Sequence, residues 1–181
     1  LESGIAWDLG LLHMDDPIIG FFPEECPGTP DENLSRITVQ HLLTMSCGIH
    51  ENTYSDLFDQ DNWVKAFLKQ SFPHEPGTFY RYSTHCSHML SAIITKVSGL
   101  SLEQFLNRYL FYPMEIYEAQ WELSPEKLTA GGMGLSLYPM SLVKIAQLLL
   151  KEGSYNGSQL ISKEYLKMAV TQQIIKQDDI N

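Results

Sequence analysis

The chain has 181 residues, of which 44% are hydrophobic and 11% aromatic, so it can bury one sizeable core and is expected to form a single domain, residues 1–181. Its 22 Asp and Glu outnumber 12 Lys and Arg, and the net charge of -10 argues against nucleic acid and anionic membrane surfaces as partners. The three cysteines, Cys26, Cys47 and Cys86, are too few and too scattered to form a disulfide framework.

The first third of the chain predicts short helices separated by turns that are rich in Pro and Gly. The pattern of Leu1–Leu9 is typical of the last turns of a helix. Thr38 is placed to cap a second short helix over Val39–Met45. In Asn62–Gln70 the apolar side chains fall on one stripe, which predicts a third helix that faces the core.

The stretch Pro76–Gly99, PGTFYRYSTHCSHMLSAIITKVSG, predicts a turn, an extended aromatic run and then a helix. The hydroxyl groups of Ser83 and Thr84 can cap that helix, whose apolar residues recur with a spacing of three and four, and Gly99 can end it. Tyr82 is therefore expected at the mouth of a helix, on a connection that is fixed at both ends.

The second half continues the helical pattern. Ser101–Tyr112 begins with a capping-box sequence and predicts a helix that packs against the preceding one. Pro113–Thr129 looks irregular, and the glycines of Gly131–Gly134 indicate backbone that turns sharply or lies very close to another segment. The predicted fold class is therefore mainly α, with at most short strands.

Two more helices are expected near the end of the chain. Ser141 is predicted to cap one over Leu142–Lys151, with Ile145, Leu148 and Leu149 facing inward. A small hairpin at Tyr155–Leu160 precedes the last helix, Lys163–Val170.

Tyr82 is the first candidate for chemistry, because a tyrosine at a helix entrance can move a proton if a nearby cation lowers its pKa from about 10. On pattern alone, a packed ring with its hydroxyl group tied to the backbone is favoured.

Two S-x-x-K tetrads, Ser124–Lys127 and Ser141–Lys144, have the spacing of a nucleophile and its base on a helix. The first lies in an irregular stretch, whereas the second is explained by a helix cap and a lysine on a solvated face.

A zinc site is a third candidate. Cys47 and His50 form one C-x-x-H pair, and His85, Cys86 and His88 provide further ligand types that zinc accepts. Because no spacing forces these segments together, packed cysteines and partly exposed histidines are the favoured interpretation.

Several segments taken together resemble the serine β-lactamase and penicillin-binding-protein family of class C type, which includes D-alanyl-D-alanine peptidases and esterases. The similar stretches are GLLHMDDPI at residues 10–18, ITVQHLLTMSCGI at 37–49, Pro76–Gly99 and Gly131–Gly153. They cover most of the chain in consistent order. The resemblance implies the helical region of the class C β-lactamase-like fold, without most or all of its αβ sheet.

Carried over residue by residue, the resemblance implies a catalytic role for Tyr82, which matches the tyrosine of the family's Y-x-N motif. Thr84 stands where that motif has an asparagine that binds substrate, and a hydroxyl group offers fewer hydrogen bonds than a carboxamide. The family's S-x-x-K serine would lie before Leu1, and the edge strand with its K-T-G or H-x-G triplet would lie after Asn181. No cofactor and no metal are implied.

The leading hypothesis is a fragment of a serine acyl hydrolase that acts on a β-lactam, a D-alanyl peptide or an ester, with the chain itself inactive. The alternatives are a non-catalytic relative that senses peptide or cell wall, and a zinc-stabilised helical module. Self-association is expected through the face that would contact the missing sheet, around Leu1–Leu9 and Gly131–Leu135. Members of the family are often extracytoplasmic or membrane-anchored, and the sequence leaves the compartment open.

Overall fold

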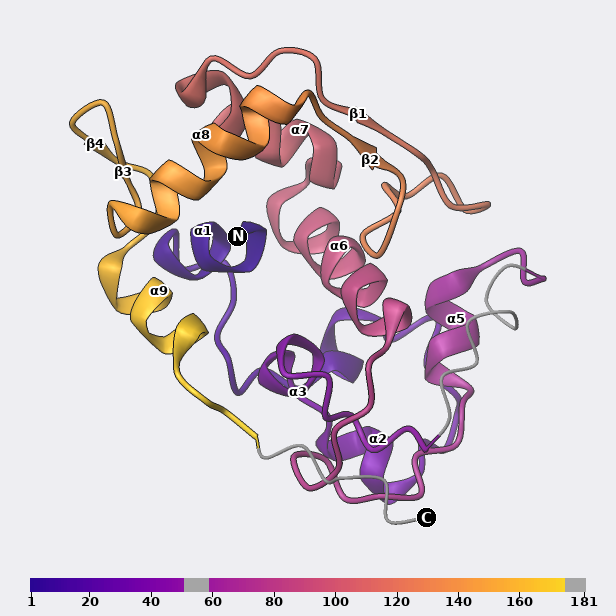
Figure 1. Cartoon of the computed structure of the whole chain (residues 1–181). Coiled ribbons are helices and arrows are strands. Elements are labelled where there is room, and N and C mark those ends of the chain that lie inside the picture. Colours follow the sequence, from indigo (N-terminus) through magenta and orange to yellow (C-terminus); the bar gives the residue numbers. More distant parts are fainter. Residues whose placement is uncertain (51–58, 175–181) are drawn as a thin grey trace, which may run out of the picture.

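The computed structural model describes residues 1–50 and 59–174 and is built mainly of short helices, as Figure 1 shows. The α-helices are α1 (Glu2–Asp8), α2 (Glu32–Arg36), α3 (Val39–Leu43), α5 (Trp63–Leu68), α6 (Thr84–Ser98), α7 (Leu102–Leu106), α8 (Pro139–Leu150) and α9 (Lys163–Val170). Shorter helical turns are η1 (Ile18–Phe21), η2 (Asn107–Phe111) and η3 (Tyr112–Met114). Two antiparallel hairpins pair β1 (Gln120–Trp121) with β2 (Leu135–Ser136) and β3 (Ser154–Tyr155) with β4 (Ser158–Gln159). The mainly helical fold predicted from the sequence is thus confirmed.

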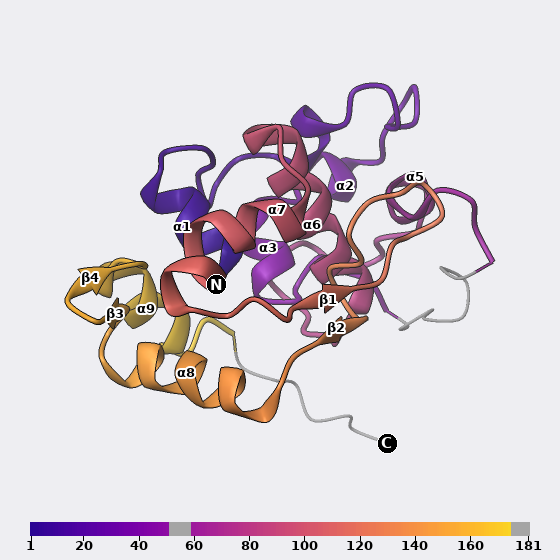
Figure 2. The same ribbon diagram turned by 90° about the horizontal axis from the view of Figure 1, so that it is seen from above.

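Helix α6 lies at the centre of the fold and packs against α1, α3, α5 and α7 (Figures 1 and 2). Most of its apolar face is buried, with Met89 and Ile93 among the residues that expose nothing to solvent. The Ser83 hydroxyl group accepts a hydrogen bond from the Cys86 N–H at 3.4 Å, and Gly99 ends the helix with φ of 70°. The predicted cap and stop signals therefore place both ends of this helix.

Other predicted helix starts are also confirmed by their caps. Thr38 forms a capping box at the start of α3, in which its backbone N–H donates to His41 Nδ1 at 3.1 Å. Ser101 and Gln104 form the expected capping box at the start of α7. Helix α9 has the predicted bounds, and the β3–β4 hairpin turns at Asn156, whose φ of 47° and whose neighbouring glycine suit a tight turn.

Some predicted details of the second half are wrong. Beyond Leu106 the helix over Ser101–Tyr112 continues as the π-helical turn η2 and the 3-10 turn η3 instead of an α-helix. Helix α8 begins at Pro139, a residue that favours the first helical position, so Ser141 lies inside the first turn and does not cap it. Leu148 is fully buried as predicted, but Leu149 is 45% exposed and does not face inward.

The sequence also missed two features that depend on packing. Helix α2 is only five residues long and is capped by Asp31, and the β1–β2 hairpin joins short segments on either side of a loop.

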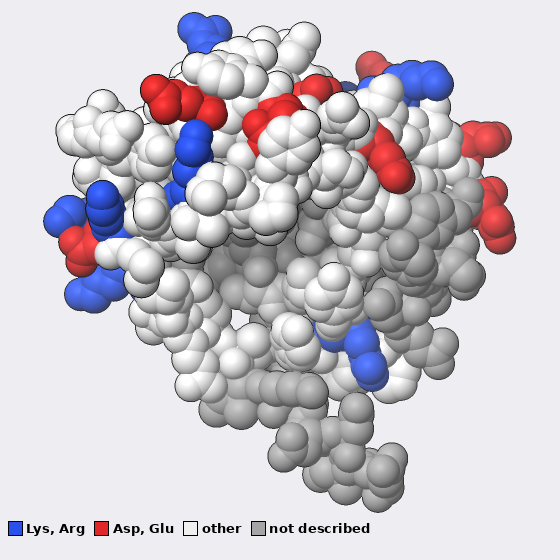
Figure 3. All heavy atoms as spheres, turned by 45° about the horizontal axis from the view of Figure 1, so that its top comes forward, with Lys and Arg blue, Asp and Glu red and all other residues white. Residues whose placement is uncertain are grey.

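Neither sign of charge forms a continuous patch on the face shown in Figure 3. Among the residues described, no helix combines the length and the apolar character needed to cross a lipid bilayer.

Candidate functional site

The connection that leads into α6 is held by main-chain hydrogen bonds to the turn after α3. The Gly77 N–H donates to the Ser46 carbonyl at 2.8 Å, and the Arg81 N–H donates to the Met45 carbonyl at 3.0 Å. Gly48 has φ of 90°, and a Cβ atom there would collide with the His74 carbonyl oxygen, so the turn and the connection approach as closely as two backbones can. The backbone that carries Tyr82 is therefore fixed by its neighbours.

The side chain of Tyr82 itself is exposed to solvent. It is 55% exposed, and none of the described residues hydrogen-bonds its hydroxyl group. This exposure does not fit the alternative of a packed ring that the isolated pattern favoured. The structure thus combines an anchored backbone with a phenol group that a reaction partner can approach.

Thr84, the first residue of α6, is in a different situation, because only 5% of it is exposed. A Cβ atom at Gly132 would overlap the Thr84 Cγ2 methyl group and would lie 2.6 Å from the Thr84 carbonyl oxygen. A Cβ atom at Gly131 would lie 2.7 Å from the Ser91 Cβ atom. The predicted close approach of the glycine segment is therefore real, and its partner is the N-terminal half of α6. Thr84 has little free surface here, and its role in substrate binding stays a prediction.

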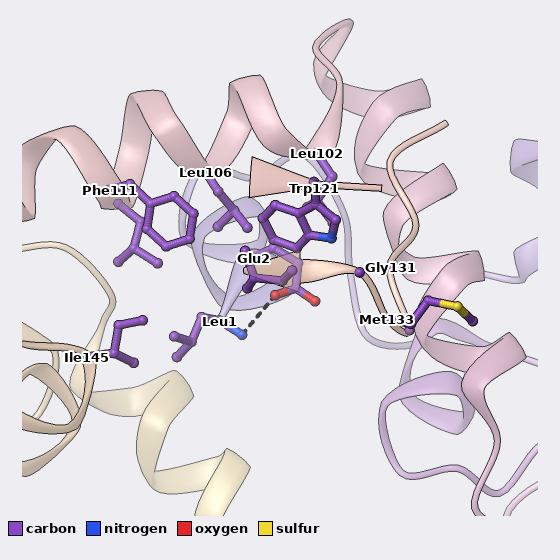
Figure 4. A pocket seen from close by; sticks show the side chains of 13 residues that line it. Leu1, Glu2, Leu102, Leu106, Phe111, Trp121, Gly131, Met133 and Ile145 are labelled. Carbon is purple, nitrogen blue, oxygen red and sulfur yellow. Dashed lines mark hydrogen bonds and ion pairs between the residues drawn. The ribbon is translucent and has the colours of Figure 1, made fainter. Parts of the chain in front are cut away.

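The same glycine segment borders the pocket in Figure 4, which has a volume of about 380 Å³. Apolar side chains from the residue before α1 and from α7, η2, β1 and α8 line it: Leu1, Leu102, Leu106, Leu110, Phe111, Trp121 and Ile145. The side chain of Glu2 also borders the pocket. Residues 131–134 consequently separate an apolar pocket on one side from the first turns of α6 on the other.

A buried polar cluster holds the loop before the glycine segment onto α5 and α6. Glu126 Oε1 accepts hydrogen bonds from the N–H groups of Trp63 at 2.9 Å and Val64 at 3.3 Å, the first two residues of α5. The Nε2 atom of His88, a buried residue of α6, lies 3.5 Å from the same oxygen. Burial alone would raise the pKa of Glu126, but its polar contacts, with His88 first among them, outweigh this and lower the pKa to about 2. A carboxylate therefore ties three segments together.

Neither S-x-x-K tetrad has the geometry of a catalytic pair. The Ser124 hydroxyl group exchanges hydrogen bonds with the backbone of Leu128, and Lys127 adopts φ of 67°, so this tetrad forms a turn. Ser141 donates to the Glu118 carboxylate, and this hydrogen bond lowers the pKa of Glu118.

In the second tetrad the lysine is also engaged. The Lys144 ammonium group donates to the carbonyls of Met114 at 2.9 Å and Glu115 at 2.8 Å, so the prediction of a solvated lysine is wrong. The first tetrad thus forms a local turn, the second links α8 to residues 114–118, and each serine hydroxyl group bonds a group other than its lysine.

The structure brings together only part of the candidate zinc ligands. Cys47 and Cys86 are in contact, with their Sγ atoms 3.3 Å apart. His50 instead stacks on His74 and Phe79, and His88 faces Glu126. Within residues 1–50 and 59–174, no three His, Cys, Asp or Glu side chains are grouped as a metal site requires.

The sequence did not predict the two carboxylates, Glu126 and Glu118, that bond residues of the helices at this site. Glu126 is 38 residues from His88, and Glu118 is 23 residues from Ser141, so no local spacing connects them. Only the fold brings these side chains together, and no helix or strand periodicity could have identified them.

The comparisons with known proteins agree with this picture. The family model described as Beta-lactamase matches residues 4–145. A candidate beta-lactamase from Bacteroides dorei DSM 17855 superimposes with a TM-score of 0.80 at 16% identity, over 98% of this chain and 55% of that one. A candidate 6-aminohexanoate-dimer hydrolase from Bacillus anthracis gives 0.76 at 17% identity, over 92% and 50%. The octameric penicillin-binding protein homologue from Pyrococcus abyssi gives 0.74 at 22% identity, over 96% and 46%.

None of the curated proteins compared by sequence matches the chain. At these low identities the three structures show the fold alone, and the chain spans about half the length of each. The family model, by contrast, matches well over half of the chain, and the matched residues include the α6 entrance and the glycine segment. The chain therefore belongs to the beta-lactamase family.

Proposed function

We propose that this chain is the helical part of a serine acyl hydrolase and supplies one member of its proton-transfer machinery, Tyr82. The observation that carries the proposal is the open phenol group on an anchored backbone, directly before the cap of a buried helix. Membership of the beta-lactamase family supports the reaction class. Candidate substrates are a β-lactam, a D-alanyl peptide or an ester, and the name of the Bacillus anthracis neighbour adds a small linear amide.

In the proposed reaction a serine hydroxyl group attacks the carbonyl carbon of the substrate, and the acyl group passes to the serine oxygen. Tyr82 accepts the serine proton and returns a proton to the leaving group, which requires a cation close enough to favour its phenolate form. The Lys144 ammonium group is held at the carbonyls of Met114 and Glu115, so it is not free to move next to Tyr82 and supply that charge. The serine and its lysine are therefore proposed to lie outside these 181 residues, as the family pattern implies.

The first test uses the chain by itself. Purified protein is incubated with a fluorescent penicillin and, separately, with a fluorophosphonate probe that acylates or phosphonylates active serines. We expect no serine to be labelled, because the hydroxyl groups of Ser124 and Ser141 are held by hydrogen bonds within the fold. Stoichiometric labelling of either serine would show that the nucleophile lies within the chain and would contradict this proposal.

A non-catalytic peptide-binding or cell-wall-sensing relative is the second candidate. The observation that favours it is Thr84, which stands in the position of the motif's asparagine and is 5% exposed. The coding sequence before Leu1 discriminates between the candidates. An S-x-x-K tetrad about seven or eight residues upstream supports catalysis, and its absence supports binding.

A further inference from the structure

Two of the three cysteines meet in the core, directly beneath the connection that carries Tyr82. Cys47 lies in the turn after α3 and Cys86 in the first turn of α6, and their Sγ atoms are 3.3 Å apart. The two residues are 2% and 1% exposed. They are separated by 39 positions in the sequence, so the contact is a product of the fold.

The surrounding backbone keeps the two thiols together. Gly48 fits against the carbonyl of His74 only because it has no Cβ atom, and this fixes the turn immediately after Cys47. The Ser83 cap bonds the backbone N–H of Cys86, which fixes the other partner. A disulfide needs its sulfur atoms about 2.05 Å apart, so a shift of only about 1 Å, within reach of side-chain rotation, would close the gap.

We propose that Cys47 and Cys86 form an intramolecular disulfide that joins the end of α3 to the start of α6 when the chain folds in the presence of a low-molecular-weight disulfide. One cysteine thiolate attacks the small disulfide and releases one small thiol, which leaves a mixed disulfide on the protein. The second cysteine displaces the remaining small thiol. The two protein thiols lose two electrons and two protons in total, and the small disulfide gains them as two thiols.

The buried environment determines when this bond can form. Burial, followed by the hydrogen bond between Cys47 and Cys86, raises the pKa of Cys47 well above its usual value, so the reactive thiolate is scarce once the chain is folded. Oxidation is therefore slow in the native protein and faster during folding, while the thiols remain accessible. The closed bond would be shielded from reductants and would tie the α3 turn to the helix that follows Tyr82.

The bond should also stabilise the protein measurably. It closes a loop of 39 residues, and restricting the unfolded chain in this way is expected to raise the melting temperature by about 10 °C for a protein of this size. Cys26 is a half-buried free cysteine outside this pair, so it is replaced in the test below.

The experiment uses the full 181-residue chain with Cys26→Ser, which leaves only the paired thiols. The protein is refolded in a buffer of oxidised and reduced glutathione and then analysed by intact mass and by peptide mapping without reductant. We expect a loss of about 2 Da, the mass of two hydrogens, and one cross-linked pair of peptides that contain Cys47 and Cys86. Adding dithiothreitol to the unfolded protein should restore the mass and remove the gain in melting temperature.

The double variants C26S/C86A and C26S/C47A are matched controls, since each retains one thiol and cannot form a disulfide within one chain. The main readout comes from C26S alone, so it does not depend on whether a control folds. Recovery of Cys47 and Cys86 as free thiols, or as two separate glutathione adducts in folded protein, would overturn the proposal.

Discussion

Replacing Gly132 with alanine tests how the glycine segment is seated on the helix that follows Tyr82. The added Cβ atom would overlap the Thr84 methyl group and would lie 2.6 Å from the Thr84 carbonyl oxygen. The methyl group can turn away, but the carbonyl belongs to the first turn of α6 and cannot. The segment must therefore move off the helix.

The size of the effect follows from these contacts. Inserting a methyl group into a well-packed contact typically costs 1–3 kcal/mol, and we expect about 2 kcal/mol here because one of the opposing atoms is backbone. The melting temperature should fall by about 4–8 °C for a protein of this length. Gly132 does not have a positive φ, so the loss would come from the contact and not from backbone strain.

Thermal unfolding followed by circular dichroism measures this loss against a matched control. Gly28 also lacks a positive φ and has no atom within 4 Å of the position of a Cβ, so Gly28→Ala should change stability by less than about 0.5 kcal/mol. Thr84→Ser removes the methyl group and should recover part of the Gly132→Ala loss in the double variant. Equal melting temperatures for Gly132→Ala and Gly28→Ala would refute the close packing of the segment on α6.

Three further predictions concern the rest of the structure. Glu126→Gln should destabilise the protein by about 2 kcal/mol at pH 7, after allowance for partial solvent screening. Folding lowers the pKa of Glu126 from 4.5 to about 2, so its contribution to the free energy of unfolding is complete above pH 4.5 and is lost as the pH falls toward 2. The free energies of unfolding of the variant and the original chain, measured in urea, should therefore become equal over that range. Lys144→Met removes two charged hydrogen bonds to carbonyls and should lower stability by about 1–3 kcal/mol, whereas an unchanged melting temperature would show that they contribute nothing. Self-association through the face around Leu1–Leu9 and Gly131–Leu135 should appear in sedimentation equilibrium at high protein concentration, and a purely monomeric profile would contradict it.

Local signals predicted the helices that begin and end with a dedicated residue. Ser83 and Gly99 define α6, and Ser101 begins α7, because a side-chain cap or a left-handed glycine acts within a few residues of itself. The predicted start of helix α8 is wrong because it relies on Ser141 as the cap. In the structure the helix begins at Pro139, and the Ser141 hydroxyl group donates to the distant Glu118 carboxylate instead.

The sequence predicted the position of Tyr82 but not the tertiary contacts around it. Tyr82 was placed at a helix entrance, but its exposure and the support of its backbone by the α3 turn depend on segments about 35 residues away. The contact between Cys47 and Cys86 and the link from Glu126 to α5 are likewise long-range. Contacts between side chains that are far apart in the sequence produce no helical or strand periodicity, so a pattern analysis cannot predict them.

The central claim is that Tyr82 moves the proton in an acyl transfer to serine, and one labelling experiment tests it most directly. The protein encoded by the complete reading frame is treated with a fluorescent penicillin and a fluorophosphonate probe, beside its Tyr82→Phe variant and a Tyr138→Phe control. Tyr138 is 67% exposed and lies at the start of α8, so its loss should leave labelling unchanged. We expect Tyr82→Phe to fold normally and to be labelled at least 100-fold more slowly, since loss of a general base typically costs about 10²–10⁴-fold. Undiminished labelling and turnover in Tyr82→Phe would contradict the claim.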